Sequence, residues 1–224
     1  MKYVKNIESA TLYDTLPKYS PQGIKYLYEK VFGLQNDSVI ADIGSGTGKL
    51  TKDLLKNGST VYGVEPDDNM RSICELNCQR FDKFNSVKGT DVKTNLVEKS
   101  IDFVTAAQSF HRFNLMGFKR ECQKILKDSR NVILIWNRYD FTTPILLAML
   151  ESFKVCYPKY ELRYEDDNIK GGFKKEVQGN RDSVREFFDG KDKMLVFDNA
   201  ICLSKKSFWT ICKRRYFGCI WKRS

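Results

Sequence analysis

The chain has 224 residues and a formal net charge of +10, with 42% hydrophobic and 29% charged residues. This balance is typical of a folded globular domain and excludes an intrinsically disordered chain. No apolar run reaches the length of about 18 residues that a transmembrane helix needs, and the N-terminus lacks the apolar stretch of a signal peptide, so we expect a cytoplasmic protein without a membrane span. Seven cysteines without a C-x-x-C pair favour neither a disulfide framework nor a zinc site, and we expect no metal.

The N-terminal third predicts a helix, a strand and a glycine turn. Ser20-Pro21 offers a cap followed by proline at the first helical position, and Gly33 is a stop signal. The apolar run 39–43 predicts a buried strand, followed by the turn Gly44–Gly48 and a helix over 47–57. Alternating glycines allow a tight turn and the close approach of a ligand. We expect the N–H groups of this turn and helix start to be free for a polar or anionic group.

A second strand is predicted over Thr60–Val64, ending at Glu65, with a helix over 67–80. In an open α/β sheet, an acidic residue about twenty positions after the glycine turn reaches the ribose hydroxyls of an adenosine. Further strands are predicted over 84–91 and 100–107. Glu65 is therefore the candidate ribose ligand.

The alternation of elements continues with a helix over 116–127, a fifth strand over 131–137 and a helix over 144–156. Such alternation predicts a doubly wound parallel sheet with right-handed connections. A ligand then binds beside the carboxyl ends of the strands.

Three strings carry a family resemblance: D-I-G-S-G-T-G at 42–48, V-E-P-D-D-N-M at 64–70 and A-A-Q-S-F-H-R-F at 106–113. The first differs from the dinucleotide pattern G-x-G-x-x-G and resembles the first motif of class I S-adenosylmethionine-dependent methyltransferases. The third is similar to the type 11-like small-molecule branch of that family. The resemblance implies a Rossmann-like, doubly wound, mostly parallel sheet with helices on both faces and a helical insertion after strand five. The family's closing strand pair is altered or missing here, unless residues 216–221 supply a last strand.

The resemblance implies S-adenosylmethionine as cofactor and S-adenosylhomocysteine as product. It places Met70 near the adenine, Asp91 near the adenine amino group and the Val92 backbone beside it. The same carboxylates could instead cap the helices that follow them. The implied cofactor contacts are Asp42, Gly44, Ser45, Gly46, Gly48, Glu65, Pro66, Met70, Asp91, Val92, Ala107 and Gln108.

The resemblance also suggests an acceptor pocket, without assigning a catalytic residue. His111, the only histidine, lies just past strand four. It is either a candidate general base or, as we favour, a residue of the pocket wall. The candidate pocket residues are Tyr13, Tyr19, Phe110, His111, Phe113, Trp136 and Tyr139.

We expect one methyltransferase domain over 1–224. It comprises a cofactor-covering segment (1–35), a cofactor-binding core (36–140), a substrate-covering insertion (141–200) and a basic C-terminal segment (201–224). The basic segment contains no acidic residue. Its seven cations are Lys205, Lys206, Lys213, Arg214, Arg215, Lys222 and Arg223.

The predicted function is methyl transfer to a small-molecule acceptor, mainly by positioning it for in-line displacement. One alternative is a nucleic-acid methyltransferase, because the basic C-terminal segment could contact RNA or DNA. Another is a catalytically inactive S-adenosylmethionine-binding protein. The sequence does not indicate the acceptor, the atom methylated or the oligomeric state.

Overall fold

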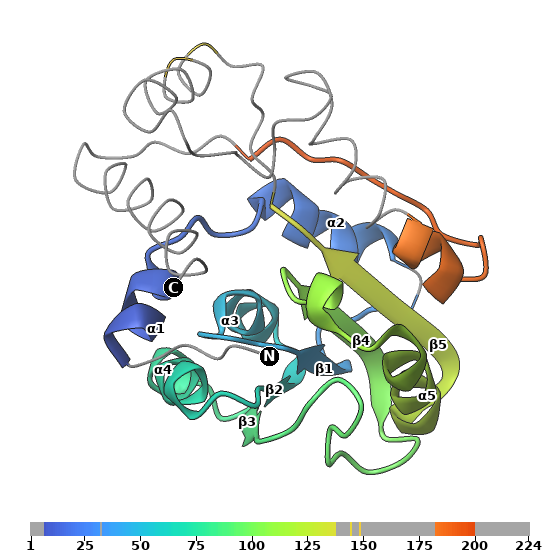
Figure 1. Cartoon of the computed structure of the whole chain (residues 1–224), viewed down its shortest axis with the longest axis horizontal. Coiled ribbons are helices and arrows are strands. Elements are labelled where there is room, and N and C mark those ends of the chain that lie inside the picture. Colours follow the sequence, from blue (N-terminus) through green and yellow to red (C-terminus); the bar gives the residue numbers. More distant parts are fainter. Residues whose placement is uncertain (1–6, 32, 138–143, 145–147, 149–181, 200–224) are drawn as a thin grey trace, which may run out of the picture. The chain divides into compact units, whose positions relative to one another are not determined.

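A computed structural model describes residues 7–31, 33–137, 144, 148 and 182–199. The chain divides into two compact units, Met1–Trp136 with Leu195–Ser224, and Asn137–Met194. Every labelled element in Figure 1 lies in the first unit. The helices are α1 (Ile7–Asp14), α2 (Pro21–Lys30), α3 (Lys49–Lys56), α4 (Asp68–Cys78), the 3₁₀ helix η1 (Phe110–Arg112) and α5 (Leu115–Ile125). The strands are β1 (Val39–Ile43), β2 (Thr60–Val64), β3 (Phe84–Val87), β4 (Ile101–Ala107) and β5 (Leu126–Ile135).

The five strands form one parallel sheet in the order β3-β2-β1-β4-β5 (Figure 1). The chain moves outward from β1 to β3, then returns to the other side of β1 for β4 and β5. Because such connections are right-handed, α3 and α4 cover one face and α5 covers the other. The predicted doubly wound, Rossmann-like fold is confirmed. The reversal between β1 and β4 creates the crevice in which such sheets bind ligands.

The core lies on the face that α2, α3 and α4 cover. Leu27 of α2 and Leu54 of α3 pack in one cluster with Ile40 of β1 and Phe103 of β4. Ile40 and Leu54 are fully buried, and Phe103 is 1% exposed. Burial of these large apolar side chains stabilises the domain and holds the central strands in register.

The predicted elements agree with the structure except at several ends. Asp67 caps α4, since its side chain accepts a hydrogen bond from the N–H of Met70. The predicted strand 84–91 is shorter, because β3 ends at Val87. The predicted strand 131–137 begins earlier, because β5 starts at Leu126 and pairs with β4 through a register irregularity near Ile101 and Phe103. The predicted helix 144–156 and strand 216–221 lie outside the described residues, apart from positions 144 and 148.

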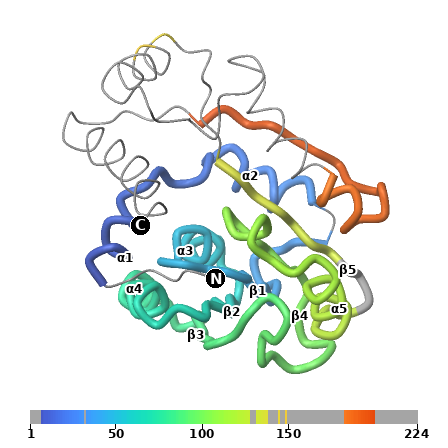
Figure 2. Tube along the Cα trace, viewed as in Figure 1, coloured from blue at the N-terminus to red at the C-terminus, as the bar shows by residue number. Residues whose placement is uncertain are grey.

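Residues 195–199 lie along α2, as the views in Figures 1 and 2 show. The ring of Phe197 lies 5.3 Å from that of Tyr26, centroid to centroid. The Ser20 hydroxyl donates to the carbonyl of Asp198 at 2.8 Å, and the Asn199 amide donates to the carbonyl of Lys18 at 2.8 Å. Contacts between distant parts of the chain therefore fix the start of α2.

Cys74 and Cys78 share one face of α4, as predicted. Both thiols are buried against Gly48, where an added Cβ would lie only 2.6 Å from Cys74 Sγ. These cysteines therefore pack α4 closely onto the start of α3.

Within the described ranges, every helix is too short or too polar to cross a bilayer.

Candidate cofactor site

A cleft opens at the carboxyl ends of β1, β2 and β4, where the predicted cofactor residues converge. Most predicted side chains line it, together with parts of the N-terminal segment. The predicted residues in its lining are Tyr13, Tyr19, Asp42, Gly44, Ser45, Gly46, Glu65, Pro66, Met70, Asp91, Ala107, Gln108 and Phe113.

The three turn glycines differ in what surrounds them. Gly44, Gly46 and Gly48 all have positive φ, at 71°, 59° and 81°. A Cβ at Gly44 would lie 2.7 Å from Ser109 Cβ, so Gly44 and Gly48 serve packing within the protein. A Cβ at Gly46 would lie 3.8 Å from Met70 Cε, an ordinary contact, and would point among the residues of the cleft. Gly46 is therefore the glycine that keeps the cleft open.

The expectation of free N–H groups in this turn is wrong for four residues. The N–H groups of Gly44 and Ser45 donate to the carbonyl of Val64 at 2.8 and 3.2 Å. The N–H of Gly46 donates to a carboxylate oxygen of Glu65 at 2.9 Å, and that of Gly48 donates to the carbonyl of Ser45. Acceptors at the end of β2 and within the turn already bind these four N–H groups, so the turn contributes space to ligand binding rather than these donors.

Glu65 lies at the tip of β2 and is 8% exposed. One carboxylate oxygen accepts from Gly46 N–H, and the other accepts from Asp67 N–H at 3.0 Å. Burial raises the pKa of Glu65, and these N–H groups and the charge of Arg112 oppose the rise. Each oxygen keeps a second lone pair, so a carboxylate fixed in this way can still accept hydrogen bonds from ligand hydroxyls.

Asp42 lines the bottom of the same cleft, but both of its oxygens bind threonines. Thr51 Oγ1 donates to one at 2.6 Å, and Thr105 Oγ1 donates to the other at 3.0 Å. Burial raises the pKa of Asp42 to about 6. Asp42 therefore joins β1, α3 and β4 beneath the glycine turn.

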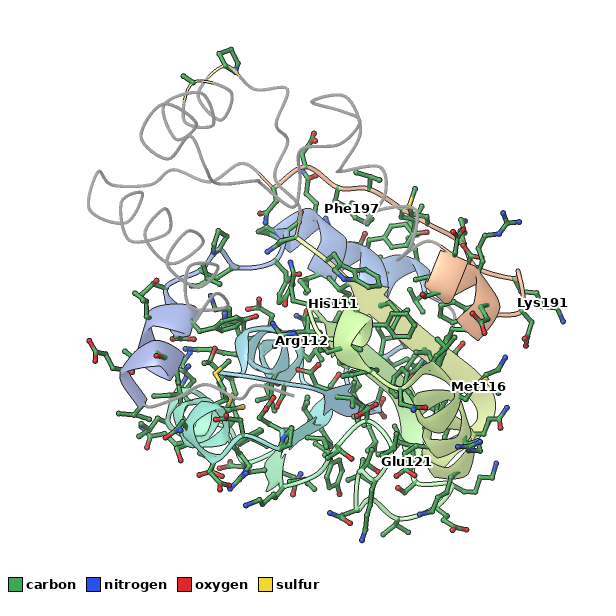
Figure 3. The ribbon with its side chains drawn as sticks, viewed as in Figure 1. His111, Arg112, Met116, Glu121, Lys191 and Phe197 are labelled. Atoms are coloured by element: carbon green, nitrogen blue, oxygen red, sulfur yellow. The ribbon has the colours of Figure 1, made fainter. Side chains whose placement is uncertain are left out.

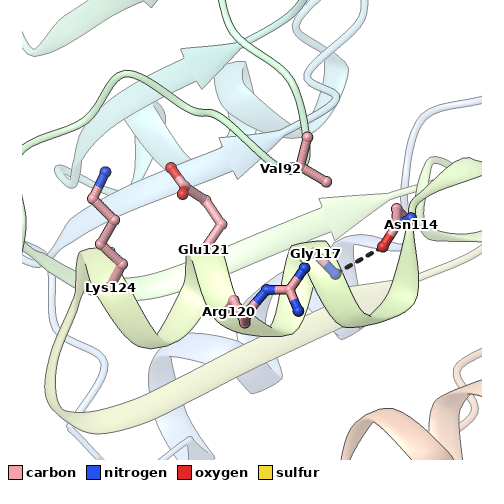
Figure 4. Close-up of a pocket in the computed structure, with 6 residues that line it drawn as sticks. All are labelled: Val92, Asn114, Gly117, Arg120, Glu121 and Lys124. Carbon is pink, nitrogen blue, oxygen red and sulfur yellow. Dashed lines mark hydrogen bonds between the residues drawn. The ribbon is translucent and has the colours of Figure 1, made fainter.

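Asp91 and Val92 lie on different sides of the loop after β3. Asp91 lines the cleft, and one of its oxygens accepts from the N–H of Asn114 at 2.7 Å. The Val92 side chain instead lines a separate hollow over α5, with Arg120 and Lys124 (Figure 4). Only the backbone of Val92 remains a candidate for the adenine contact.

Buried Glu121 anchors this loop to α5. One of its oxygens accepts from both the N–H and the hydroxyl of Thr94, at 2.8 and 2.6 Å. Gly117 lies close to Val92, since an added Cβ there would be 2.4 Å from Val92 Cγ1. The loop that carries Asp91 is therefore held firmly beside the cleft.

The N-terminal segment covers the cleft from the side of α3. Tyr13 and Tyr19 both line it, and Tyr19 is 9% exposed. Burial raises the pKa of Tyr19 well above its ordinary value, so its phenol stays protonated. Lys49 Nζ donates to the carbonyl of Leu16 and lies 5.7 Å from the centroid of the Tyr13 ring. These contacts hold the cover against the glycine turn.

The candidate acceptor residues after β4 divide into two groups. Phe113 lines the cleft, whereas Phe110 is 3% exposed and packs edge-on against Phe113, Phe118 and Trp136. Phe110 and Trp136 therefore support the wall rather than form it.

His111 projects from η1 and is exposed, outside the cleft lining (Figure 3). Partial desolvation of the ring and the charge of neighbouring Arg112 lower the pKa of His111. The remaining candidate, Tyr139, lies outside the described residues.

Several cleft residues were not predicted. The other lining residues are Thr47, Lys49, Leu50, Asp67, Thr90, Ser109 and Arg112. Most are immediate neighbours of predicted positions and could have been found from strand ends and helix starts. Arg112 lies between the predicted residues His111 and Phe113, but nothing in its local sequence distinguishes an arginine that lines a cleft from a solvated surface arginine.

Comparisons with known proteins agree with this geometry. Residues 41–134 match the family model described as a methyltransferase domain. An uncharacterised methyltransferase of Schizosaccharomyces pombe is 28% identical over 140 residues, covering 62% of this chain and 55% of that protein. An uncharacterised methyltransferase of a Geobacillus species is 35% identical over 102 residues, covering 41% of this chain and 47% of that protein. The chain thus spans about half the length of the curated relatives it matches.

Solved structures share the fold. A protein from Methanococcus maripaludis, described as a candidate S-adenosyl-L-methionine-dependent methyltransferase, superposes with a TM-score of 0.60 at 18% identity. The match covers 84% of this chain and 87% of that one. Together, the matched segment 41–134, the sheet order and the glycine turn followed by Glu65 support a class I S-adenosylmethionine-dependent methyltransferase domain of the type 11 branch over that segment.

Proposed function

We propose that this chain is an active S-adenosylmethionine-dependent methyltransferase whose acceptor is a small molecule. The main support for this proposal is the cleft. Its lining combines Gly46 and Glu65 with Tyr13 and Tyr19 of the N-terminal segment and Phe113 after β4. A cleft covered by its own N-terminal segment suits an acceptor that fits beneath aromatic rings.

Two features of the cleft fit the cofactor. Gly46 leaves free the space that a side chain would fill, next to Met70 and Tyr13. The Thr47 hydroxyl is buried and has no hydrogen-bond partner among the described residues, so it is available to a polar ligand group. The residues that would hold the cofactor are Glu65 at the ribose and Met70 and Asp91 at the adenine, with Gly46 leaving the space that the ligand fills.

Bound S-adenosylmethionine supplies a methyl group on a positively charged sulfur. The protein residues then bind and orient. Glu65 fixes one end of the ligand, while Tyr13 and Tyr19 exclude water from the cleft. Holding an acceptor in line with the reacting bond can supply about 7–11 kcal/mol of the barrier reduction without a catalytic side chain. We therefore assign no general base, and His111 stays outside the proposed machinery.

The first test is calorimetric titration of the full chain with S-adenosylmethionine and S-adenosylhomocysteine, with NAD as control. Binding of both sulfur ligands but not of NAD is expected. Incubation with methyl-labelled cofactor should then label small acceptors rather than RNA or DNA. Label that appears only in nucleic acid, in a reaction steeply inhibited by salt, would contradict the small-molecule acceptor.

A further inference from the structure

Arg112 is an exposed cation that lines the cofactor cleft. It is the last residue of η1, directly after β4, and it lines the cleft with Phe113. Its backbone N–H donates to the carbonyl of Ser109 at 2.9 Å, which fixes the turn that presents the side chain (Figure 3). Burial raises the pKa of Glu65, and the nearby guanidinium charge of Arg112 opposes that rise.

Four carboxylates line the same cleft, and neutral groups bind each of them. Asp42 accepts from two threonine hydroxyls, and Glu65 accepts from two backbone N–H groups. Asp67 accepts from the first turn of α4, and Asp91 accepts from the backbone N–H at the start of α5. None of these acids forms a salt bridge with Arg112 in the described part of the chain.

Arg71 shows the contrast. Its guanidinium pairs with Asp68 at 2.5 Å and with Glu75 at 3.7 Å along α4. Exposed Arg120 of α5 has no ion pair among the described residues either, but it lines the hollow over α5 rather than the cleft. Arg112 has no such pair among the described residues, although it lies close to several acids.

We propose that the acceptor is a carboxylic acid and that Arg112 binds its carboxylate. This inference rests on the proposed methyltransferase function. A guanidinium presents paired N–H donors in a planar fork that matches the two oxygens of a carboxylate. Phe113 lies on the same surface, so the acid carries an apolar body next to its charged group. Arg112 is a specificity-determining residue in this arrangement.

The experiment uses the full chain saturated with S-adenosylhomocysteine, titrated with matched acids and amides. The probes are phenylacetate with phenylacetamide, hexanoate with hexanamide, and phenyl phosphate as a second anion. Calorimetry on the wild type should show each acid binding about tenfold more tightly than its amide, as a charge-assisted pair predicts. Phenyl phosphate should bind no more tightly than phenylacetate.

Three variants locate the effect. Arg112→Gln should abolish the preference for acids, and Arg112→Lys should restore part of it. Arg120→Gln removes an exposed arginine on α5, outside the cleft, and should behave as the wild type. The affinity for S-adenosylhomocysteine should be the same in all four proteins.

Several results would overturn the inference while leaving the methyltransferase intact. These are equal binding of acids and amides, a preference that survives Arg112→Gln, and tighter binding of phenyl phosphate. A loss of S-adenosylhomocysteine affinity in Arg112→Gln would assign the arginine to the cofactor instead. Failure of the wild type to bind S-adenosylhomocysteine would defeat the proposed function as well, and the two failures are thereby distinguished.

Discussion

Replacing Gly46 by alanine would put one methyl group into the cofactor cleft. The new Cβ would lie 3.8 Å from Met70 Cε and 3.9 Å from Tyr13 Cε1, so nothing in the protein has to move. The backbone at this position has φ +59°, which an alanine adopts at a cost of about 1–2 kcal/mol. We therefore expect a folded variant of reduced stability whose cleft is partly filled.

Gly33→Ala is the matched control. Gly33 also has a positive φ, +81°, and its Cβ would lie 3.8 Å from the nearest atom, Phe103 Cζ. It does not line the cleft. Both substitutions should lower the free energy of unfolding in urea by about 1–2 kcal/mol, and Gly46→Ala alone should weaken the binding of S-adenosylhomocysteine.

Ligand-induced stabilisation measures the difference. A ligand at about 100 times its dissociation constant stabilises the native state by about 2.7 kcal/mol, and a tenfold weaker ligand at the same concentration by about 1.4 kcal/mol. At about 2–4 °C per kcal/mol for a domain of this size, Tm should rise by roughly 5–11 °C in the wild type and in Gly33→Ala. In Gly46→Ala the rise should be at most roughly 3–6 °C.

An unchanged Tm shift in Gly46→Ala would refute the assignment of this glycine to the ligand cleft. So would an equal loss of shift in Gly33→Ala, because backbone strain would then account for the effect. Calorimetric titration of both folded variants with S-adenosylhomocysteine at one temperature measures the binding affinity directly, independently of their unfolding free energies.

Glu65→Ala should weaken binding of S-adenosylhomocysteine by about 1.5–3 kcal/mol in calorimetry, because a charge-assisted hydrogen-bond acceptor is lost; an unchanged affinity would contradict the ribose assignment. The pKa of buried Asp42 is raised to about 6, from about 3.9 in the unfolded chain, so the native state holds the proton more tightly and stability falls as pH rises from about 4 to 6. In urea titrations at pH 4 and pH 6, Asp42→Asn should reduce the loss of unfolding free energy between the two pH values by about 1–3 kcal/mol. A loss equal to that of the wild type would show that another group titrates. Phe103→Ala should cost about 3–5 kcal/mol of unfolding free energy, since the ring is fully enclosed; a loss below about 1 kcal/mol would mean that the core tolerates the cavity.

The central strands were predictable because short-range signals determine them. Thr60–Val64 is an apolar, β-branched run between Gly58 and the acidic tip, and β2 has those bounds. The early start of β5 was not predictable. Residues 126–131 read Leu-Lys-Asp-Ser-Arg-Asn, a polar run without a strand pattern, and in it Leu126 and Asn131 pair with β4 across a register irregularity.

Helix α1 also escaped prediction. It buries only Ala10, so its sequence shows no apolar stripe at helical spacing. The family resemblance, rather than any pattern of hydrophobicity, led to the prediction of a covering segment with Tyr13 and Tyr19, and both side chains line the cleft.

At the site, the sequence indicated which carboxylates lie at the ends of strands, but not which groups donate hydrogen bonds to them. Asp42, Glu65 and Asp91 were all predicted to contact the cofactor, which stays a prediction for each. The structure adds that hydroxyls of α3 and β4 engage Asp42, while backbone N–H groups engage the other two. Several of those partners are distant in the sequence, such as Thr105 for Asp42 and Asn114 for Asp91, so local spacing could not reveal them.

The contacts of residues 195–199 with the start of α2 have a kinetic consequence. Ser20 and Lys18, which bind this segment, directly adjoin Tyr19 in the cover of the cleft. We expect cofactor release to displace this cover, which would strain hydrogen bonds to a segment about 180 residues away. The residence time of the cofactor is therefore linked to how firmly the distal segment is attached, so a change at Phe197 should alter the dissociation rate without touching the ligand.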